Sequence, residues 1–444
     1  MSDTLVASKS LADRAQGRRP HRCGAPHSRS VLASEFPRMR LCLPSRARRV
    51  ITSLLHIAAV SVVTVDVANA QYGALDLSFN PDPAVQSAGC LAVQPDGKVL
   101  LFGHVQVGGV TAERLVRLTE TGAMDSSFAP QTTTVGWEIH EILVQSDGRI
   151  IIAGKVSTST DPLASRVVRL NADGTLDTSF ASAPSAGGNL GSSLVRCAAL
   201  MPDGGVLVAG SFTNYAGVPR ARVARLLPSG ALDPAFSPGQ GIAGLSASVY
   251  DCVVQPDGRS ILAGSFLTYD SAPRRCLVRI QPNGSLDSSF SVGQGTDGFI
   301  GALALDASGH VWIGGEFYSY FDWNTNSSWA IARIQPDGTP ASFGGTGTWE
   351  GAWVIPVEAL AIQPNGRALV GGLFDLYNST SVDGFVRVTA TGARDTSFSP
   401  TLSTSSSWPF PGVGRIAISA DGRAVVSGAF DTYNSHSRNG LARI

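Results

Sequence analysis

One short pattern recurs seven times along this chain, and it limits the possible fold more than any other feature. Each copy contains a tight-turn sequence, as in QPDGKVLLFG, and a glycine seven residues after the turn residue. A period of this kind is typical of propellers, solenoids and other repeat architectures. The turn residues lie 51 to 57 positions apart and are Asp96, Asp147, Asp203, Asp257, Ser308, Asn365 and Asp421. The glycines that follow them are Gly103, Gly154, Gly210, Gly264, Gly315, Gly372 and Gly428.

Each repeat is predicted to form four short strands, which in the first repeat are 90–94, 98–103, 114–118 and 124–128. Asp-Gly and Asn-Gly dipeptides favour tight hairpins because both residues tolerate positive φ. The first two strands are apolar on nearly every residue, so both of their faces should be buried. Four-stranded units of about 50 residues are typical of β-propeller blades. The sequence therefore predicts an all-β, seven-bladed propeller with four-stranded blades over residues 71–444.

The third strand of every repeat carries an arginine, and five repeats have an aspartate eight residues later. We expect each pair to face across a hairpin and to hold the two strands together, rather than to bind a ligand. In the fifth repeat Ala341 takes the place of the aspartate, so Arg333 is expected to lack a partner. The five pairs are Arg117–Asp125, Arg169–Asp177, Arg225–Asp233, Arg279–Asp287 and Arg387–Asp395.

The seventh repeat has its arginine, Arg443, but the sequence ends at Ile444, before an aspartate. A matching segment, LDLSF, stands at residues 75–79 with no third strand before it. We therefore expect this N-terminal segment to form the outer strand of the last blade, with Asp76 opposite Arg443. Such closure would remove an exposed sheet edge.

Residues 1–70 resemble a leader rather than a part of the fold. A basic stretch at 46–50 precedes an apolar run at 51–65 that is too short for a typical membrane span, and ANA at 68–70 is a cleavage pattern. We predict a secretory signal peptide that is cleaved between Ala70 and Gln71, with a long basic extension before it; an amphipathic membrane anchor is the alternative. Met39 would give a leader of ordinary length. The mature chain is then secreted, periplasmic or on the cell surface, without a membrane span.

Charge and cysteine content narrow the range of functions. Residues 1–70 hold 11 basic and 4 acidic residues, which leaves 23 basic and 30 acidic residues in the remainder. A chain of that sign does not suit nucleic-acid binding. The cysteines after residue 70 are Cys90, Cys197, Cys252 and Cys276. We expect free, buried thiols, because their places in the repeats set them too far apart for disulfides.

The repeat resembles a known family at the level of whole motifs. QPDGKVLLFG, GSFTNYAGVPRARVARLLPSGALDPAF and QPNGSLDSSF are similar to the delta-60 repeat of exported bacterial β-propeller proteins. The resemblance covers residues 75–444, and the fifth repeat departs from it with DASG and PDGTPASF. It implies an exported propeller and brings no catalytic residues with it.

Candidate site residues come from aligning the repeats on their turns. The positions seven and six residues before the turn should lie on the innermost strands at the channel mouth, on the face with the long loops. Several repeats have Gly or Ala there, so the fold does not require charged groups at these positions. The candidate ligand-binding residues are His140, Glu141, Arg196, Tyr250, Asp251, Glu358 and Arg415. A solvated channel lining is the alternative interpretation.

The long-loop face is the candidate binding face for a second reason. Six tryptophans fall in its loops, namely Trp137, Trp323, Trp329, Trp349, Trp353 and Trp408. Binding residues concentrate on loops that a rigid scaffold holds in place. A GxFxxY element also occurs five times and ends in Tyr215, Tyr269, Tyr320, Tyr377 and Tyr433. Its regular recurrence favours loop packing over an aromatic sugar platform.

Motifs for catalysis are missing from the sequence: there is no GxSxG, HExxH, P-loop or dinucleotide turn. We therefore expect a non-enzymatic, exported binding or interaction module, monomeric, with no cofactor or metal. Its partner would be a protein, a glycan or a small polar ligand on the long-loop face, and not a nucleic acid. A hydrolase or oxidoreductase with its site at the channel mouth is the alternative.

Overall fold

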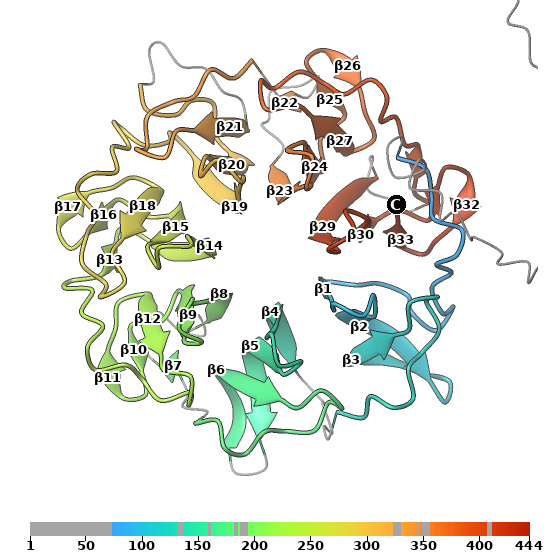
Figure 1. The fold of residues 1–444 in the computed structure, drawn as a ribbon, viewed down its shortest axis with the longest axis horizontal. Coiled ribbons are helices and arrows are strands. Elements are labelled where there is room, and N and C mark those ends of the chain that lie inside the picture. The colour runs from blue at the N-terminus through green and yellow to red at the C-terminus, as the bar shows by residue number, and fades with distance from the viewer. Residues whose placement is uncertain are drawn as a thin grey trace, which may run out of the picture. The chain divides into compact units, whose positions relative to one another are not determined.

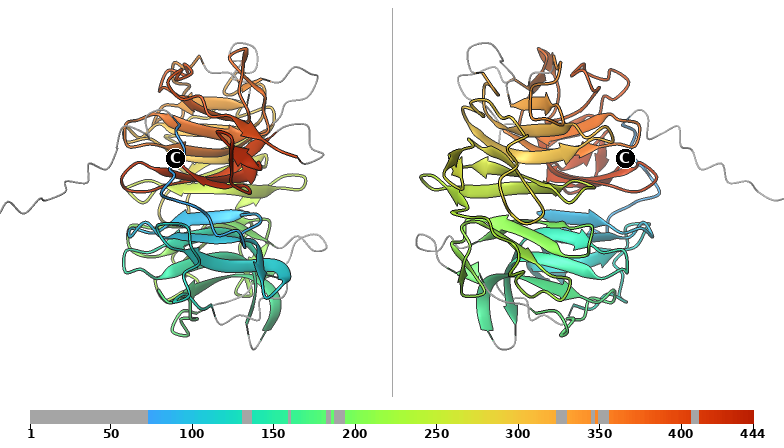
Figure 2. Two further views of the ribbon diagram at one scale, coloured as in Figure 1. Left: turned by 90° about the vertical axis from the view of Figure 1, so that its right-hand side faces the viewer. Right: turned by 60° about the vertical axis from the view of Figure 1, so that its left-hand side comes forward.

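The computed structural model describes residues 73–130, 137–158, 161–181, 185–186, 194–322, 330–344, 347–348, 356–405 and 411–444. The predicted leader, residues 1–70, lies outside them. In the described part all regular structure is β, and no helix occurs. Seven three-stranded sheets surround a common centre (Figure 1). Seen from the side, their strands run between the two faces of this arrangement (Figure 2).

Each of the seven sheets is formed by one repeat, with one strand near the centre, one in the middle and one outside. The innermost strands are β1 (Cys90–Val93), β4 (Glu138–Val144), β8 (Val195–Leu200), β14 (Ser248–Val254), β19 (Phe299–Leu305), β23 (Val357–Ile362) and β29 (Gly412–Ile418). The middle strands are β2 (Val99–Val107), β5 (Ile150–Thr158), β9 (Val206–Gly210), β15 (Ser260–Ser265), β20 (Val311–Glu316), β24 (Ala368–Gly372) and β30 (Ala424–Ala429). The outer strands are β3 (Val110–Leu118), β6 (Asp161–Leu170), β12 (Val223–Leu226), β18 (Leu277–Ile280), β21 (Ile331–Ile334), β27 (Phe385–Val388) and β33 (Leu441–Arg443).

Four smaller sheets of two-residue strands lie in the long loops; the first strand of each precedes the innermost strand of a repeat, and the other two lie between its middle and outer strands. They are β7 (Ser185–Ala186), β10 (Asn214–Tyr215) and β11 (Val218–Pro219); β13 (Ile242–Ala243), β16 (Thr268–Tyr269) and β17 (Ala272–Pro273); β22 (Gly347–Thr348), β25 (Leu376–Tyr377) and β26 (Thr380–Ser381); and β28 (Leu402–Ser403), β31 (Thr432–Tyr433) and β32 (His436–Ser437). The tyrosine of four GxFxxY elements ends the second strand of such a sheet.

The core lies between neighbouring sheets, because each sheet is apolar on both faces. One cluster joins Ile261 of β15 to Ile300 and Ile313 of the next sheet, and all three side chains are fully buried. The burial predicted for the second strand of each repeat is confirmed, whereas the first, innermost strand is only partly buried because it borders the central cavity. Another cluster joins Val425 of β30 to Leu101 of β2, so the last repeat packs against the first.

The prediction of four strands in each sheet is wrong, because the expected fourth strand is reduced to a single bridging residue. In the first repeat Met124 pairs with Leu118, and the chain then turns. The Asp125 carboxylate accepts hydrogen bonds from the backbone N–H and the hydroxyl of Ser127, at 3.0 and 2.6 Å. Phe128 N–H donates to the carbonyl of Asp125 at 3.1 Å. These local bonds close a turn and prevent the segment from extending into a strand.

The arginine of each outer strand joins several elements at once, as Arg279 illustrates. Its Nε donates to Asp287 at 2.7 Å, and one Nη donates to the Ser289 hydroxyl at 3.2 Å. Its guanidinium lies 4.6 Å from the centroid of the Phe290 ring. The other Nη donates to the carbonyl of Pro336, in the next repeat, at 2.5 Å. Asp, Ser and Phe of the LDxSF motif are thus the three contacts of one arginine.

All five predicted Arg–Asp pairs are present, at 2.7 to 3.4 Å. The pairs are buried and contact the next repeat, which supports the interpretation that they hold the fold together and do not bind a ligand. The expectation that Arg333 lacks a partner is wrong. Arg333 Nη2 donates to Asp306 at 2.6 Å. Asp306 lies two residues before the turn residue of its repeat, at a position where four other repeats have Gln. The carboxylate that binds the arginine of the fifth repeat therefore comes from the hairpin between the innermost and middle strands, and not from the segment after the outer strand.

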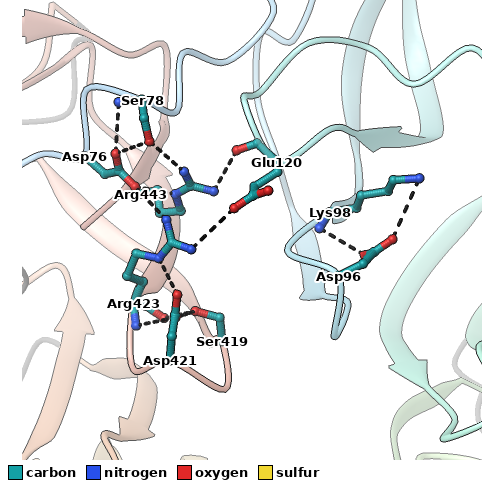
Figure 3. Close-up of polar contacts among 9 residues, drawn as sticks. All are labelled: Asp76, Ser78, Asp96, Lys98, Glu120, Ser419, Asp421, Arg423 and Arg443. Carbon is teal, nitrogen blue, oxygen red and sulfur yellow. Dashed lines mark hydrogen bonds and ion pairs between the residues drawn. The ribbon is translucent and has the colours of Figure 1, made fainter. Parts of the chain in front are cut away.

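The N-terminal segment gives Arg443 the contacts that the other arginines find within their own repeats (Figure 3). Asp76 N–H donates to the Arg443 carbonyl at 2.8 Å, and Arg443 Nε donates to the Asp76 carboxylate at 2.7 Å. The guanidinium also contacts the Ser78 hydroxyl at 3.1 Å and the Phe79 ring at 4.8 Å. Its remaining Nη donates to the Glu120 carbonyl of the first repeat at 2.7 Å.

Candidate functional site

A β-bulge near the start of the innermost strands positions the candidate site. In six of these strands the pairing with the middle strand skips one residue. The skipped residues are His140, Arg196, Tyr250, Gly301, Glu358 and Gly414. On a regular strand consecutive side chains point to opposite faces. A bulge re-aims a side chain, so the skipped residue and the residue after it can line the same cavity.

The glycine found seven residues after every turn residue makes room for this bulge. A Cβ atom added to Gly264 would lie 2.1 Å from the carbonyl oxygen of Ser248, and the seven equivalent glycines show approaches of 2.0 to 2.4 Å. The backbone of the innermost strand thus occupies the space that a side chain would need. The repeated glycine is therefore needed because the bulge, which points side chains into the channel, leaves no room for a Cβ atom opposite it.

The structure brings all seven candidate residues to the wall of one cavity. This cavity lies at the centre of the arrangement, has a volume of about 200 Å³, and receives at least one residue from each of the seven innermost strands. Cys90, Gly301, Ala302 and Ala359 complete much of the remaining wall. The prediction that these side chains converge is thus met by the geometry.

The carboxyl groups of the cavity differ in their surroundings. Burial raises the pKa of Glu141 to about 8, and the nearby Asp251 carboxylate adds to this rise while Arg415 opposes it. Burial also raises the pKa of Asp251, to about 6, against hydrogen bonds from the backbone N–H groups of Cys252 and Leu303 at 2.7 and 2.6 Å. Glu358 also lines the cavity, and burial raises its pKa. At neutral pH Glu141 is therefore mostly uncharged.

Two arginines face this cavity without an acidic partner. In the described part of the chain, neither Arg196 nor Arg415 forms an ion pair, whereas the repeated arginine of every outer strand does. The Arg196 guanidinium lies 5.6 Å from the centroid of the Tyr250 ring, and its buried Nε has no hydrogen-bond partner. Arg415 donates to the carbonyl of its neighbour Gly414 at 2.7 Å. At neutral pH the cavity therefore has two arginine charges, a largely neutral Glu141 and a mostly ionised Asp251.

Glu138 and Lys155 lie beside the cavity residue His140, and the alignment of the repeats does not identify them. Glu138 lies two residues before His140 on β4, with its carboxylate 2.6 Å from Lys155 Nζ and 3.7 Å from His140 Nε2. Burial lowers the pKa of His140, which favours the neutral ring. Cys90 lines the floor, and burial raises the pKa of its thiol. In the sequence, the contact between Glu138 and His140 is indicated only by their two-residue spacing on one strand.

The raised pKa of Glu141 predicts how stability depends on pH. The folded state holds this proton up to about pH 8, while the unfolded chain releases it near 4.5. The contribution of Glu141 to the free energy of unfolding should therefore be highest below pH 4.5 and fall as the pH rises to about 8, by at most about 1.4 kcal/mol for each pH unit. Urea unfolding of the wild type and of Glu141→Gln between pH 4 and 9 measures this. The free energy of unfolding of the wild type, relative to that of Glu141→Gln, should fall as the pH rises. A difference that stays constant with pH would contradict a raised pKa of Glu141.

The aromatic residues of the long loops fall into two groups. The five GxFxxY tyrosines are buried, and four of their hydroxyls donate to backbone carbonyls, as Tyr269 does to Gly284 at 2.5 Å. The loop-packing interpretation is thus confirmed. Trp137 is also buried. The other five loop tryptophans, Trp323, Trp329, Trp349, Trp353 and Trp408, lie outside the described residues.

Thiols and metal sites were also assessed in the described residues. Cys90, Cys197, Cys252 and Cys276 are free and buried, as predicted. Among residues with described positions, no group of three or more His, Cys, Asp or Glu side chains could hold a metal ion. In the same part of the chain, no helix is long and apolar enough to cross a membrane.

Sheets of this kind around a central cavity define the β-propeller class. A family model described as a domain of unknown function (DUF5122) with a β-propeller fold matches residues 94–128, 145–180, 202–236, 255–290, 307–340, 363–398 and 419–444. The chain belongs to this family. The seven matched segments correspond to the seven repeats found in the sequence. No curated protein matches the chain.

Solved structures similar to the chain share little sequence with it. The extracellular domain of BT4673 from B. thetaiotaomicron is 12% identical with a TM-score of 0.47; the match covers 83% of this chain and 40% of the other. The chain thus spans less than half the length of that protein. YCF48 from Cyanidioschyzon merolae is 13% identical with a TM-score of 0.42, over 82% of this chain and 96% of the other. A glucose dehydrogenase is 12% identical with a TM-score of 0.37, over 82% and 98%.

Proposed function

We propose that this protein is an exported β-propeller that binds a small anionic ligand, such as a carboxylate, at the mouth of its central channel. The observation that carries the proposal is the pair Arg196 and Arg415, which face one cavity without an ion-pair partner in the described residues. Convergent polar groups in a concave site are the usual starting hypothesis for a binding site. Arginine suits carboxylates because its planar N–H groups match the two oxygens.

Seven blades in a closed ring form part of the same proposal. The N-terminal segment 75–79 would complete the last blade, and the contacts of Arg443 support this because they repeat those of Arg279. A closed ring would fix the spacing of the seven innermost strands. The cavity residues would then keep their positions without a ligand, which lowers the entropic cost of binding.

Export is the part of the proposal that rests on sequence alone. The basic stretch, apolar run and small-residue motif within residues 46–70 support cleavage by a signal peptidase. Mass spectrometry of the exported protein should find Gln71 at its N-terminus. A mature protein that retains residues 46–70 would show that the leader is not cleaved there.

A hydrolase is the second candidate, since two carboxyl groups with separated pKa values can serve as acid and base. Glu141 and Asp251 form such a pair. However, both oxygens of Asp251 accept backbone N–H bonds, and one of these bonds comes from the neighbouring strand β19. This arrangement suits a link between two sheets better than a base. Product analysis after incubation with bound ligand distinguishes the two candidates, since a binding protein returns the ligand unchanged.

The binding proposal is tested with Arg196→Ala and Arg415→Ala. Each change removes one guanidinium from the cavity, and loss of a charged hydrogen bond costs about 1.5–3 kcal/mol, or roughly 10- to 100-fold in Kd. Titration calorimetry with a panel of small carboxylates, including sugar acids and amino acids, measures the effect. The double variant should bind none of them at millimolar concentration.

The matched control is Arg220→Ala, which removes a half-buried arginine outside the lining of the central cavity; its guanidinium donates to the carbonyl of Pro219 at 3.0 Å. It should leave binding unchanged. If the wild type binds no carboxylate in the panel, or if the double variant binds as well as the wild type, the proposed function is wrong.

A further inference from the structure

A second cavity adjoins the central one, and the two share part of their walls. It is an open groove of about 700 Å³ between the third and fourth repeats. Arg196 and Tyr250 line both cavities. One face of this pair therefore looks into the channel mouth and the other looks along the groove. A ligand held by Arg196 in the channel would therefore lie next to the groove.

The groove differs from the channel in its chemistry. Among the described residues its wall contains the hydroxyl residues Ser211, Thr213, Ser246 and Ser248 and no carboxylate. The Ser211 hydroxyl accepts the Leu194 N–H at 3.1 Å, and the Ser248 hydroxyl donates to the Val249 carbonyl at 3.4 Å, so each keeps part of its hydrogen-bonding capacity for a ligand. Its second arginine, Arg222, donates to the carbonyls of Ala247 and Ile242 at 2.8 and 2.7 Å, so this charge is engaged within the protein. Leu245 stands at the rim with 94% of its surface exposed. Charge selection is thus confined to the channel, while the groove offers hydroxyl groups and one apolar contact.

We propose that the site recognises the acidic end of an oligosaccharide, with a carboxylate-bearing sugar in the channel mouth and the next sugars in the groove. This inference rests on the proposed function, since it needs Arg196 and Arg415 to hold the carboxylate. The channel cavity of about 200 Å³ is smaller than the roughly 300–1,000 Å³ typical of drug-sized ligands, so it suits a single terminal unit. Hydroxyl groups along the groove match the hydroxyl groups of uncharged sugars as both donors and acceptors.

A peptide with a free C-terminal carboxylate is the competing ligand. Extended peptides bind by pairing with an exposed strand edge, which supplies a ladder of N–H and C=O groups. The wall of the groove at Gly244–Ala247 is a bend and turn between β13 and β14. It provides no such ladder, so the groove favours a sugar chain.

The test compares ligands that differ in length beyond a common acidic end. Calorimetry is performed on the full mature chain with glucuronate and galacturonate, with their glycosides carrying one or two neutral sugars, and with neutral oligosaccharides. A set of short peptides with free C-termini is included. The acidic oligosaccharides should bind about tenfold more tightly than the acidic monosaccharides, because the groove adds hydrogen bonds. Neutral oligosaccharides should not bind.

Thr213→Tyr is the variant that isolates the groove. Thr213 lines the groove but not the channel, and the equivalent residue of the fifth repeat is Tyr318, so the repeat tolerates tyrosine at this position. This change should reduce the affinity for the oligosaccharide to that of the monosaccharide and leave the monosaccharide unaffected. The control Leu267→Tyr makes the same substitution one repeat further on, outside the groove lining, and should change neither.

The outcomes separate this inference from the proposed function. If acidic monosaccharides and oligosaccharides bind equally well, or if Thr213→Tyr weakens neither, the end-recognition inference is overturned while the anion site stands. Tighter binding of peptides than of acidic sugars also overturns it. If no carboxylate binds at all, both proposals are wrong.

Discussion

Removal of residues 71–80 should lower the free energy of unfolding by about 5 kcal/mol or more, far beyond the effect of trimming an ordinary terminus. Arg443 would lose Asp76, and a buried charge left without its partner costs about 3–5 kcal/mol. Phe79, which is fully buried, would also be lost, at a cost of about 1.5–3 kcal/mol for its apolar surface. Urea unfolding of the mature chain with and without the segment measures the difference.

Point variants separate the ion pair from the remainder of the segment. Asp76→Ala should cost about 3 kcal/mol, since Arg443 loses its carboxylate partner and retains its contacts with Ser78, Phe79 and Glu120. Leu77→Ser is the matched control: Leu77 is 66% exposed, and other repeats have serine, threonine or proline at this position. It should be nearly neutral. If removal of residues 71–80 leaves the unfolding curve unchanged, the N-terminal segment does not complete the last blade.

Gly264→Ala should destabilise the fold by roughly 3 kcal/mol, the upper end of the range for overpacking. The new Cβ would lie 2.1 Å from the Ser248 carbonyl oxygen and 2.9 Å from the Cα of Val249, and both are backbone atoms of β14. To relieve this contact, β14 must move at its bulge, where Tyr250 and Asp251 enter the cavity. We therefore expect weaker ligand binding as well as lower stability.

Gly89→Ala provides the control for this substitution. A Cβ at Gly89 would meet only the Phe102 carbonyl oxygen, at an ordinary 3.8 Å, and its φ is not in the positive range. Thermal and urea unfolding of the two variants should differ clearly, with Gly89→Ala close to the wild type. Equal stability of Gly264→Ala and the wild type would contradict the explanation that the glycine recurs because a Cβ atom does not fit against the innermost strand.

Much of the architecture could be predicted because it depends on patterns within one repeat. The turn residues, the apolar strands and the Arg–Asp spacing are local, and each is present in at least five of the seven repeats. The predicted fourth strand was wrong because the serine two residues after the aspartate, as in Asp125 and Ser127, closes a turn that competes with strand pairing. The partner of Arg333 was missed because Asp306 is close in space but lies in a different strand of the repeat.

The candidate site was predictable as a set of positions but not as a geometry. Aligned columns identified the seven residues, since a common offset from the turn places them at a common height. That two consecutive residues such as Tyr250 and Asp251 share one cavity depends on the bulge, which the sequence indicates only through the glycine facing it. The adjoining groove could not be predicted, because its walls come from loops of two different repeats that have no common pattern.

The most direct test of the central claim is a crystal structure of the mature protein with the sugar acid that binds most tightly in calorimetry. We expect the ligand carboxylate in the central cavity, within hydrogen-bonding distance of the guanidinium groups of Arg196 and Arg415. A ligand bound elsewhere on the protein, with only water in the cavity between these two arginines, would contradict the account.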